Sequence, residues 1–199
     1  FLLTALLPAP LPALHAAEPA PVDFTVKLET VMKHDAGGCL WFHPRVATIP
    51  CPSPARPAVL MTIQKHLKIS DYYSGLHVMR RARPDAPWTG PALPPELDWR
   101  QQPDGVTISV ADVTPGWHAK SKRVIAIGTK LFYSPAGEQL MDRPRAYDFA
   151  YAVYDPRADK WSTWKSLDMP MGDDNRFSSI APGCTQWLVK PDGTLLVPI

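Results

Sequence analysis

Several features are scarce or absent in this sequence. Basic and acidic side chains nearly balance, with 21 Lys and Arg against 19 Asp and Glu, and no long basic run occurs. This balance argues against a nucleic-acid partner. No stretch repeats its apolar residues with the period of a helix, which argues against a helical fold. The apolar run at residues 1–7 is too short to span a membrane.

Cysteine is also scarce. The sequence has three cysteines, Cys39, Cys51 and Cys184, and none belongs to a Cys-x-x-Cys motif or a paired His/Cys spacing. We therefore expect no metal site and no cofactor. If the protein is exported, Cys39 can pair with Cys51 across a short loop. Because three is an odd number, at least one thiol has no partner within the chain.

Proline and tryptophan, by contrast, are abundant, with 24 and 7 residues. Proline-rich connections between short tryptophan-bearing strands are typical of all-β proteins. Residues 1–20 contain an apolar run and a Leu-His-Ala-Ala sequence similar to a signal-peptidase site. We expect a secreted or periplasmic protein whose folded domain occupies residues 21–199. The sequence starts without Met and stops within a strand-like run, so we expect a fragment of a longer chain.

Short strands are predicted about every dozen residues, with turn chemistry between them. The expected strands are residues 24–28, 58–63, 76–79, 106–110, 123–127, 130–133, 147–154, 185–189 and 194–198, besides the run that begins near Arg45. A weak repeat joins residues 77–88 to residues 151–161, because each has a strand, a polar turn with Asp, and then Trp. A tryptophan after the turn between the third and fourth strands fits the four-stranded blades of a β-propeller.

The sequence Trp-Phe-His-Pro-Arg, residues 41–45, combines two aromatic rings, an imidazole and a guanidinium. A rigidly held arginine beside aromatic faces suits a planar carboxylate, which it binds with two parallel hydrogen bonds. The alternative is that the aromatic residues are core and that Arg45 is a structural ion-pair partner.

Six segments together resemble the sialidase-like superfamily of β-propeller glycosidases, and in particular exported bacterial exo-α-sialidase-type proteins with Asp-box repeats. They are residues 41–45, 59–64, 70–77, 111–118, 150–156 and 183–199. The resemblance implies a six-bladed or five-bladed propeller with an axial pocket for an acidic sugar. It implies that Arg45 binds the substrate carboxylate and that Asp71 is the acid/base. The Asp-box pattern is only partly kept, since residues 83–88 retain just its Asp and Trp.

Five further residues are candidates for the lining of this pocket, and four of them have an alternative role. Asp112 and His118 flank Thr-Pro-Gly-Trp, and a Pro-Gly turn would bring them together to bind sugar hydroxyls. Gln64 and His77 lie in or beside predicted strands and either face the propeller axis or form a buried polar network. Gln186 opens the last hairpin as a hydrogen-bond donor. For Asp71 and Asp112 the alternative is a side chain that caps a loop or turn, and for His118 it is an imidazole whose hydrogen bonds are satisfied beside that turn.

We therefore expect an exported glycoside hydrolase that removes a terminal acidic sugar from a glycan or polysaccharide. Two alternatives remain open. A non-catalytic lectin or adhesin needs the arginine and the tryptophans but no acid/base. A structural propeller that mediates protein contacts needs neither.

Overall fold

The structure is a computed structural model that describes residues 22–35, 37–51, 56–67, 72–141, 149–170, 177 and 180–199. The chain forms two units, Phe1–Val31 and Met32–Ile199. The described part of the first unit, residues 22–31, contains no helix or strand. All sheets belong to the second unit.

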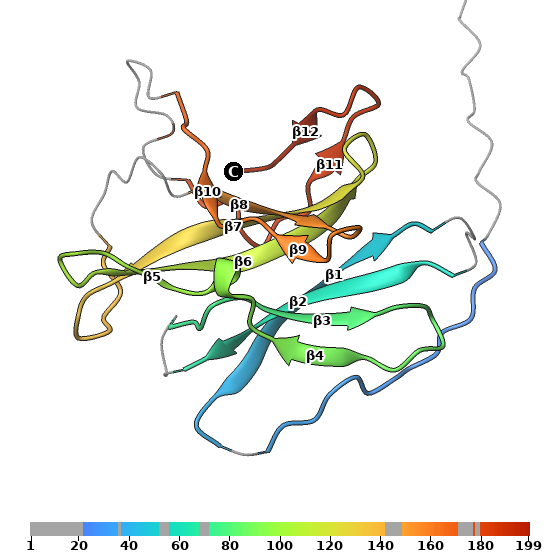
Figure 1. Cartoon of the computed structure of the whole chain (residues 1–199), viewed down its shortest axis with the longest axis horizontal. Helices are drawn as coiled ribbons and strands as arrows, with labels where there is room; N and C mark the ends of the chain where they lie inside the picture. The colour runs from blue at the N-terminus through green and yellow to red at the C-terminus, as the bar shows by residue number, and fades with distance from the viewer. Residues whose placement is uncertain are drawn as a thin grey trace, which may run out of the picture. The chain divides into compact units, whose positions relative to one another are not determined.

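The first sheet is an antiparallel meander of four strands in the order β1-β2-β3-β4 (Figure 1). The strands are β1 (Leu40–Ile49), β2 (Ala58–His66), β3 (His77–Arg81) and β4 (Thr89–Ala92). The register of β1 against β2 shifts between Phe42 and Arg45. The bulge lies at His43 and Pro44, as expected for a residue that cannot donate a ladder hydrogen bond.

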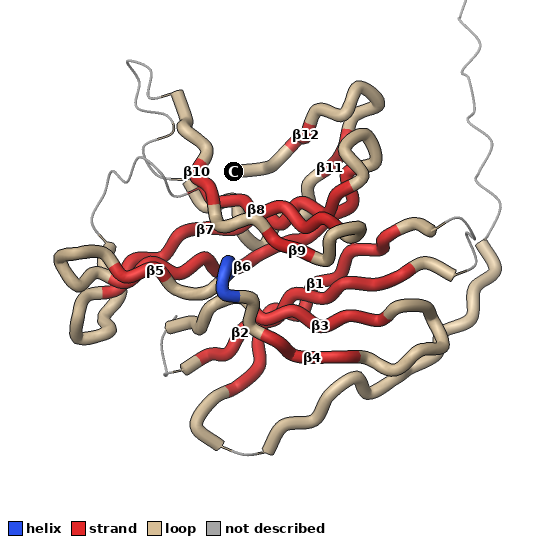
Figure 2. The backbone as a smooth tube through the Cα atoms, in the orientation of Figure 1, coloured by secondary structure: helices blue, strands red, loops and turns tan. Residues whose placement is uncertain are grey.

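The second sheet is also an antiparallel meander. Its strands are β5 (Arg100–Gln101), β6 (Thr107–His118), β7 (Arg123–Tyr133), β8 (Phe149–Asp155), β9 (Lys160–Trp161) and β10 (Lys165–Ser166). The two short strands β9 and β10 both pair with β8, so they act as one interrupted strand. A separate hairpin joins β11 (Leu188–Val189) to β12 (Leu195–Leu196). A single 3₁₀ turn, Pro95–Leu97, is the only helical element among the described residues (Figure 2).

The two larger sheets share one hydrophobic core. Its members come from β1, β2 and β3 and from β6, β7 and β8, and they include Leu60, Val78, Val113, Val124 and Tyr154. Strand β1 packs against β6, so these two strands form the seam between the sheets. Burial of this apolar surface is the main force that joins the two sheets.

These elements confirm the prediction of an all-β fold. The weak repeat lies on equivalent hairpins, because Trp88 immediately precedes β4 and Trp161 lies in β9, so each tryptophan follows the turn into the last strand position of its sheet. The expected strand at residues 24–28 is wrong. Phe24 and Leu28 are 80% and 92% exposed, and no strand in the described part of the chain pairs with this alternating segment.

Two further expectations are corrected. The Pro-Gly turn expected between Asp112 and His118 is absent, since β6 runs straight through Pro115 and Gly116 in register with β7. Pro115 is tolerated because β5 pairs with β6 only near Thr107 and Ile108, and no other described strand pairs with this edge of β6 near Pro115.

The disulfide that the sequence allowed between Cys39 and Cys51 is not formed, because none of the three cysteines belongs to a disulfide. These two flank opposite ends of the ten-residue strand β1. A strand of that length spans roughly 30 Å, whereas the Cα atoms of a disulfide lie within about 7 Å. No helix in the described part of the chain is long and apolar enough to cross a membrane.

Candidate functional site

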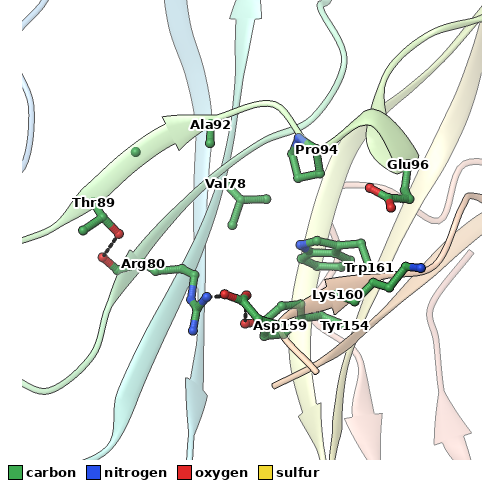
Figure 3. A pocket seen from close by; sticks show the side chains of 11 residues that line it. Val78, Arg80, Thr89, Ala92, Pro94, Glu96, Tyr154, Asp159, Lys160 and Trp161 are labelled. Atoms are coloured by element: carbon green, nitrogen blue, oxygen red, sulfur yellow. Dashed lines mark hydrogen bonds and ion pairs between the residues drawn. The ribbon is translucent and has the colours of Figure 1, made fainter. Parts of the chain in front are cut away.

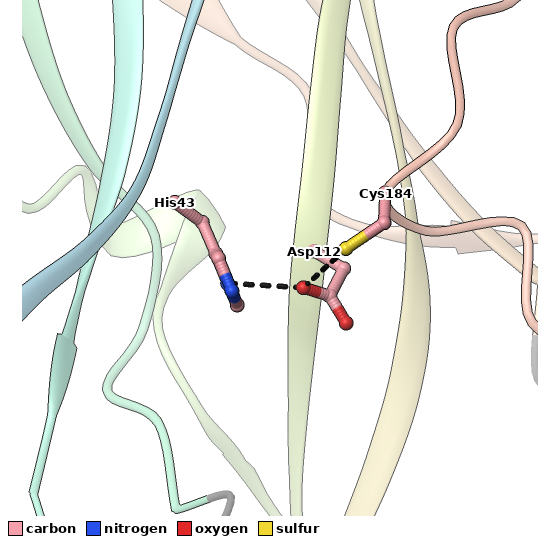
Figure 4. Close-up of side chains that lie close together, drawn as sticks. All are labelled: His43, Asp112 and Cys184. Carbon is pink, nitrogen blue, oxygen red and sulfur yellow. Dashed lines mark hydrogen bonds and ion pairs between the residues drawn. The ribbon is translucent and has the colours of Figure 1, made fainter.

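Three side chains with metal-binding or catalytic chemistry meet at the seam between β1 and β6. The Asp112 carboxylate of β6 lies between the imidazole of His43, on β1, and the thiol of Cys184, on the segment before β11 (Figure 4). Asp112 Oδ1 is 3.0 Å from His43 Nδ1 and accepts a hydrogen bond from Cys184 Sγ at 2.9 Å. The three residues therefore bring together segments that are far apart in the sequence.

The backbone at this cluster is constrained. Five described residues other than glycine have a positive φ, and three of them are His43, Asp112 and Cys184, with values of 52°, 57° and 61°. Such conformations are uncommon for these residue types and persist only where the surroundings enforce them. At Asp112 and His43 they coincide with the bulges of β6 and β1.

The approach of Cys184 to Asp112 depends on the preceding glycine. A Cβ atom at Gly183 would lie 2.4 Å from the Cβ atom of Asp112, so a larger residue would push the two segments apart. The Cys184 amide donates to the Asp112 carbonyl at 2.9 Å, and the Gly183 amide donates to Thr129 Oγ1 at 3.0 Å. These contacts fix the thiol beside the carboxylate.

The thiol is not arranged as an activated nucleophile. Burial, followed by the hydrogen bond to Asp112, raises the pKa of the Cys184 thiol, and the neighbouring Arg45 guanidinium only partly opposes this. An enzyme nucleophile needs a lowered pKa and a base in contact with it. Here the thiol donates its hydrogen bond to a carboxylate and not to the imidazole.

Aromatic and imidazole rings continue from His43 toward the start of β1. The His43 ring lies 5.4 Å from the ring of Tyr73 and 5.8 Å from that of Phe42, and His66 lies 5.0 Å from Phe42. Phe42 and His66 also line an open hollow of about 500 Å³. A surface of this kind offers flat apolar faces next to the polar cluster.

Two of the residues predicted from the sequence, Arg45 and Asp112, belong to this cluster. Asp71 lies outside the described residues, although Tyr73, two positions later, contacts His43. Gln186 is exposed and lies between Cys184 and β11. Their roles in substrate binding or catalysis stay predictions.

Gln64 and His77 lie in the interior instead. Gln64 is 1% exposed, and its amide nitrogen donates to the carbonyls of Ser74 and Val110, both at 2.9 Å, so it connects the two sheets. His77 is 7% exposed and packs its ring edge-on at 5.0 Å from Trp41. Both positions correspond to the buried polar network that the sequence left open as their alternative role.

His118 lies at the far end of β6 from Asp112. Its Nε2 donates to the Gly193 carbonyl at 2.9 Å, and its Nδ1 lies 2.7 Å from Ser121 Oγ. Because Gly193 is in the turn between β11 and β12, His118 anchors this hairpin. The structure therefore does not bring Asp112 and His118 together.

A second hollow, of about 350 Å³, lies between β4 and the β8–β9 hairpin (Figure 3). Its Arg80 and Asp159 form an ion pair, and the hydroxyl of Tyr154 donates to Asp159 at 2.7 Å. None of the described residues predicted for the site lines it. Since its central charges bind each other, this hollow is a weaker candidate than the cluster at the seam.

Sequence reasoning missed two members of the cluster. The sequence singles out His43 only as part of the Trp-Phe-His-Pro-Arg motif, and Cys184 belongs to no metal-binding spacing. The contact between Cys184 and Asp112 joins residues 72 positions apart, and no local spacing rule detects such a pair.

Comparison of the chain with protein-family models, curated proteins and solved structures gives no match. The resemblance to sialidase-like proteins therefore stays a prediction, and the function has to be argued from the geometry.

Proposed function

We propose that the protein is a glycan-acting hydrolase that releases a terminal acidic sugar, with its substrate bound over Arg45 and Asp112. The observation that carries this proposal is their convergence. Two residues chosen independently from the sequence, one for a carboxylate and one for hydroxyl groups, lie at the same cluster beside Cys184. An acidic sugar carries both chemical groups on one ring.

The proposal includes a β-propeller whose blades are the successive sheets. Three observations support it: the two larger sheets are meanders, the repeat occupies equivalent hairpins, and the cluster draws on the first long strand of each larger sheet and on the segment that leads into the third sheet. Only the two-residue strand β5 precedes β6 in the second sheet. His43 and Arg45 come from β1, Asp112 from β6, and Cys184 from the segment that leads into β11. In a propeller the first strand of each blade lines the axis, and an axial pocket is the usual place for a ligand.

Each group then has a defined role. Arg45 binds the sugar carboxylate with paired hydrogen bonds, and Asp112 accepts hydrogen bonds from ring hydroxyls. Phe42 and His66 offer faces on which a neighbouring sugar of the glycan stacks. Asp71 is the acid/base, in the segment that connects β2 to Tyr73.

The test is hydrolysis of chromogenic glycosides of sialic acid and of uronic acids by the purified protein. We expect Asp71→Asn to lower kcat by roughly 10²–10⁴-fold, the usual contribution of general acid–base catalysis. We expect Arg45→Lys to raise KM, because a lysine cannot form the bidentate pair. Asp85→Asn and Arg157→Lys, at exposed turn residues, serve as matched controls that leave both constants unchanged. Unchanged kinetics in both test variants would overturn the assignment.

The exposed hollow beside Phe42 and His66 favours a second candidate, a carbohydrate-binding protein without catalysis. In that case the protein binds acidic glycans on an array, Arg45→Lys weakens the binding, and no sugar is released. Absence of both binding and hydrolysis on acidic glycans would contradict both candidates.

A further inference from the structure

We propose that His43, Asp112 and Cys184 form a zinc site. This proposal stands on the arrangement of the three side chains and does not rest on the proposed function. It also departs from the sequence, whose cysteine and histidine spacing gave no reason to expect a metal.

The distances suit a tetrahedral ion. The candidate ligand atoms are an imidazole nitrogen, a carboxylate oxygen and a thiol sulfur, and all three lie within 4.8 Å of one another. Zinc bonds of about 2.0–2.3 Å with tetrahedral angles place ligand atoms about 3.3–3.6 Å apart. The observed Nδ1–Oδ1 and Sγ–Oδ1 distances are 3.0 and 2.9 Å, so small side-chain rotations make room for the ion.

The donor set selects the metal. One nitrogen, one sulfur and one oxygen are a mixed, borderline-soft combination, whereas Mg²⁺ and Ca²⁺ require mostly oxygen ligands. A carboxylate and a thiolate together carry two negative charges, which balance one divalent cation beside a neutral imidazole. Three protein ligands leave the fourth position of the zinc for water or another ligand.

The protein holds these groups in place in advance. Each of the three residues has a left-handed backbone conformation, and their side chains come together around the Asp112 carboxylate (Figure 4). His43 Nδ1 is buried and has no hydrogen-bond partner among the described residues, since its close contact with Asp112 lacks hydrogen-bond alignment. A metal ion would satisfy this nitrogen. Its binding replaces the thiol proton, which leaves to solvent, and no oxidation or reduction is involved.

The test is direct binding of Zn²⁺ to chelator-treated, reduced protein, with a chromophoric chelator as competitor. We expect one zinc per chain and an increase in Tm on zinc addition. With Co²⁺ in place of zinc, we expect the intense visible bands of a tetrahedral ion and a thiolate-to-cobalt charge-transfer band in the near ultraviolet.

The variants assign the ligands. Cys184→Ser should abolish the charge-transfer band, and Asp112→Asn and His43→Gln should each abolish stoichiometric binding. The matched control is the double variant His34→Gln/Cys39→Ser, which removes the other neighbouring His–Cys pair, with Nε2 and Sγ 3.7 Å apart. This control should bind one zinc as before.

Each outcome decides the proposal. Less than half an equivalent of bound zinc, or a charge-transfer band that survives in Cys184→Ser, would overturn it. If a ligand variant fails to fold, the cobalt spectrum of the unchanged protein still decides, because a spectrum without a thiolate band excludes Cys184 as a ligand. Zinc binding without hydrolysis of acidic glycosides would support this site while contradicting the hydrolase, and hydrolysis without zinc binding would do the reverse.

Discussion

His77 makes the stability of the protein depend on pH. Burial lowers its pKa from the ordinary value of 6.5, and Lys65 acts in the same direction. The hydrogen bond that its Nδ1–H donates to the Gly75 carbonyl at 3.0 Å and the nearby Asp98 only partly oppose this lowering of the pKa. Below pH 6.5 the unfolded chain binds a proton that the folded protein does not. Stability is therefore lost as the pH falls from 6.5 to the lower pKa of the folded state, by at most about 1.4 kcal/mol per pH unit.

The variant His77→Asn tests this prediction, because the amide keeps a donor for Gly75 but does not titrate. Denaturant unfolding between pH 7.5 and 5 should show a shallower loss of stability in this variant than in the wild type. His34→Asn removes an exposed imidazole and should leave the wild-type slope unchanged. Equal slopes in the wild type and His77→Asn would show that this histidine has the same pKa in both states.

Residue chemistry predicted part of the site and no more. Arg45 and Asp112 could be selected because an arginine beside aromatic residues suits a carboxylate and an aspartate suits hydroxyl groups, although each also had an ordinary structural alternative. Gln64 shows the limit of this reasoning. Its side-chain amide could bind a ligand, yet it is buried and donates hydrogen bonds to the carbonyls of Ser74 and Val110. This burial results from the packing of the two sheets, which the sequence does not reveal.

At the scale of elements, Gly116 sets how closely the C-terminal segment approaches β6. A Cβ atom at this position would lie 2.4 Å from Cζ2 of Trp187. The ring cannot move freely, since it is 4% exposed and its Nε1 donates to the Thr114 carbonyl at 3.1 Å. We expect Gly116→Ala to destabilise the protein by about 1–3 kcal/mol in denaturant unfolding, as overpacking does.

A double variant separates this clash from any other effect of the alanine. Trp187→Leu removes the ring and should itself be destabilising, but Gly116→Ala should cost little in that background. The coupling energy of the double-mutant cycle should therefore approach the whole effect of Gly116→Ala. If the two effects are additive, Gly116→Ala destabilises β6 itself and not through a clash with Trp187.

Strands were predictable where they alternate apolar and polar residues or form short buried runs. Strand β6 was only half predicted, because Pro115 and Gly116 have the chemistry of a turn. Their place in a strand depends on β7, which pairs with them on one side, and on Trp187, which covers the glycine. Residues 24–28 show the opposite error. Their apolar and polar residues alternate as in a strand, but no described segment pairs with them and they form no strand.

At the scale of the molecule, the sequence repeat identified equivalent hairpins but not how the sheets join. The joint is specific: Thr62 Oγ1 of β2 is within hydrogen-bond distance of the carbonyls of Arg45 in β1 and Val113 in β6, at 3.4 Å each. Thr62 has no exposed surface. Threonine is common in strands, so nothing in the sequence distinguished Thr62 as the residue that joins the two sheets.

The shared core predicts that both sheets unfold in one transition. Leu60 of β2 and Val124 of β7 are completely buried in the same cluster, and the polar contacts of Thr62 and Gln64 cross the same seam. We expect Leu60→Ala to cost about 2–5 kcal/mol and Val124→Ala about 2 kcal/mol. Either substitution should accelerate amide exchange equally in β2 and in β7, because neither sheet keeps its core when the other opens.

The control is Val46→Ala, at a 55% exposed position of β1, which should change the free energy of unfolding by less than about 0.5 kcal/mol. Faster exchange in β2 alone after Leu60→Ala would mean that the sheets fold separately, and the seam that holds His43 against Asp112 would then open without loss of either sheet.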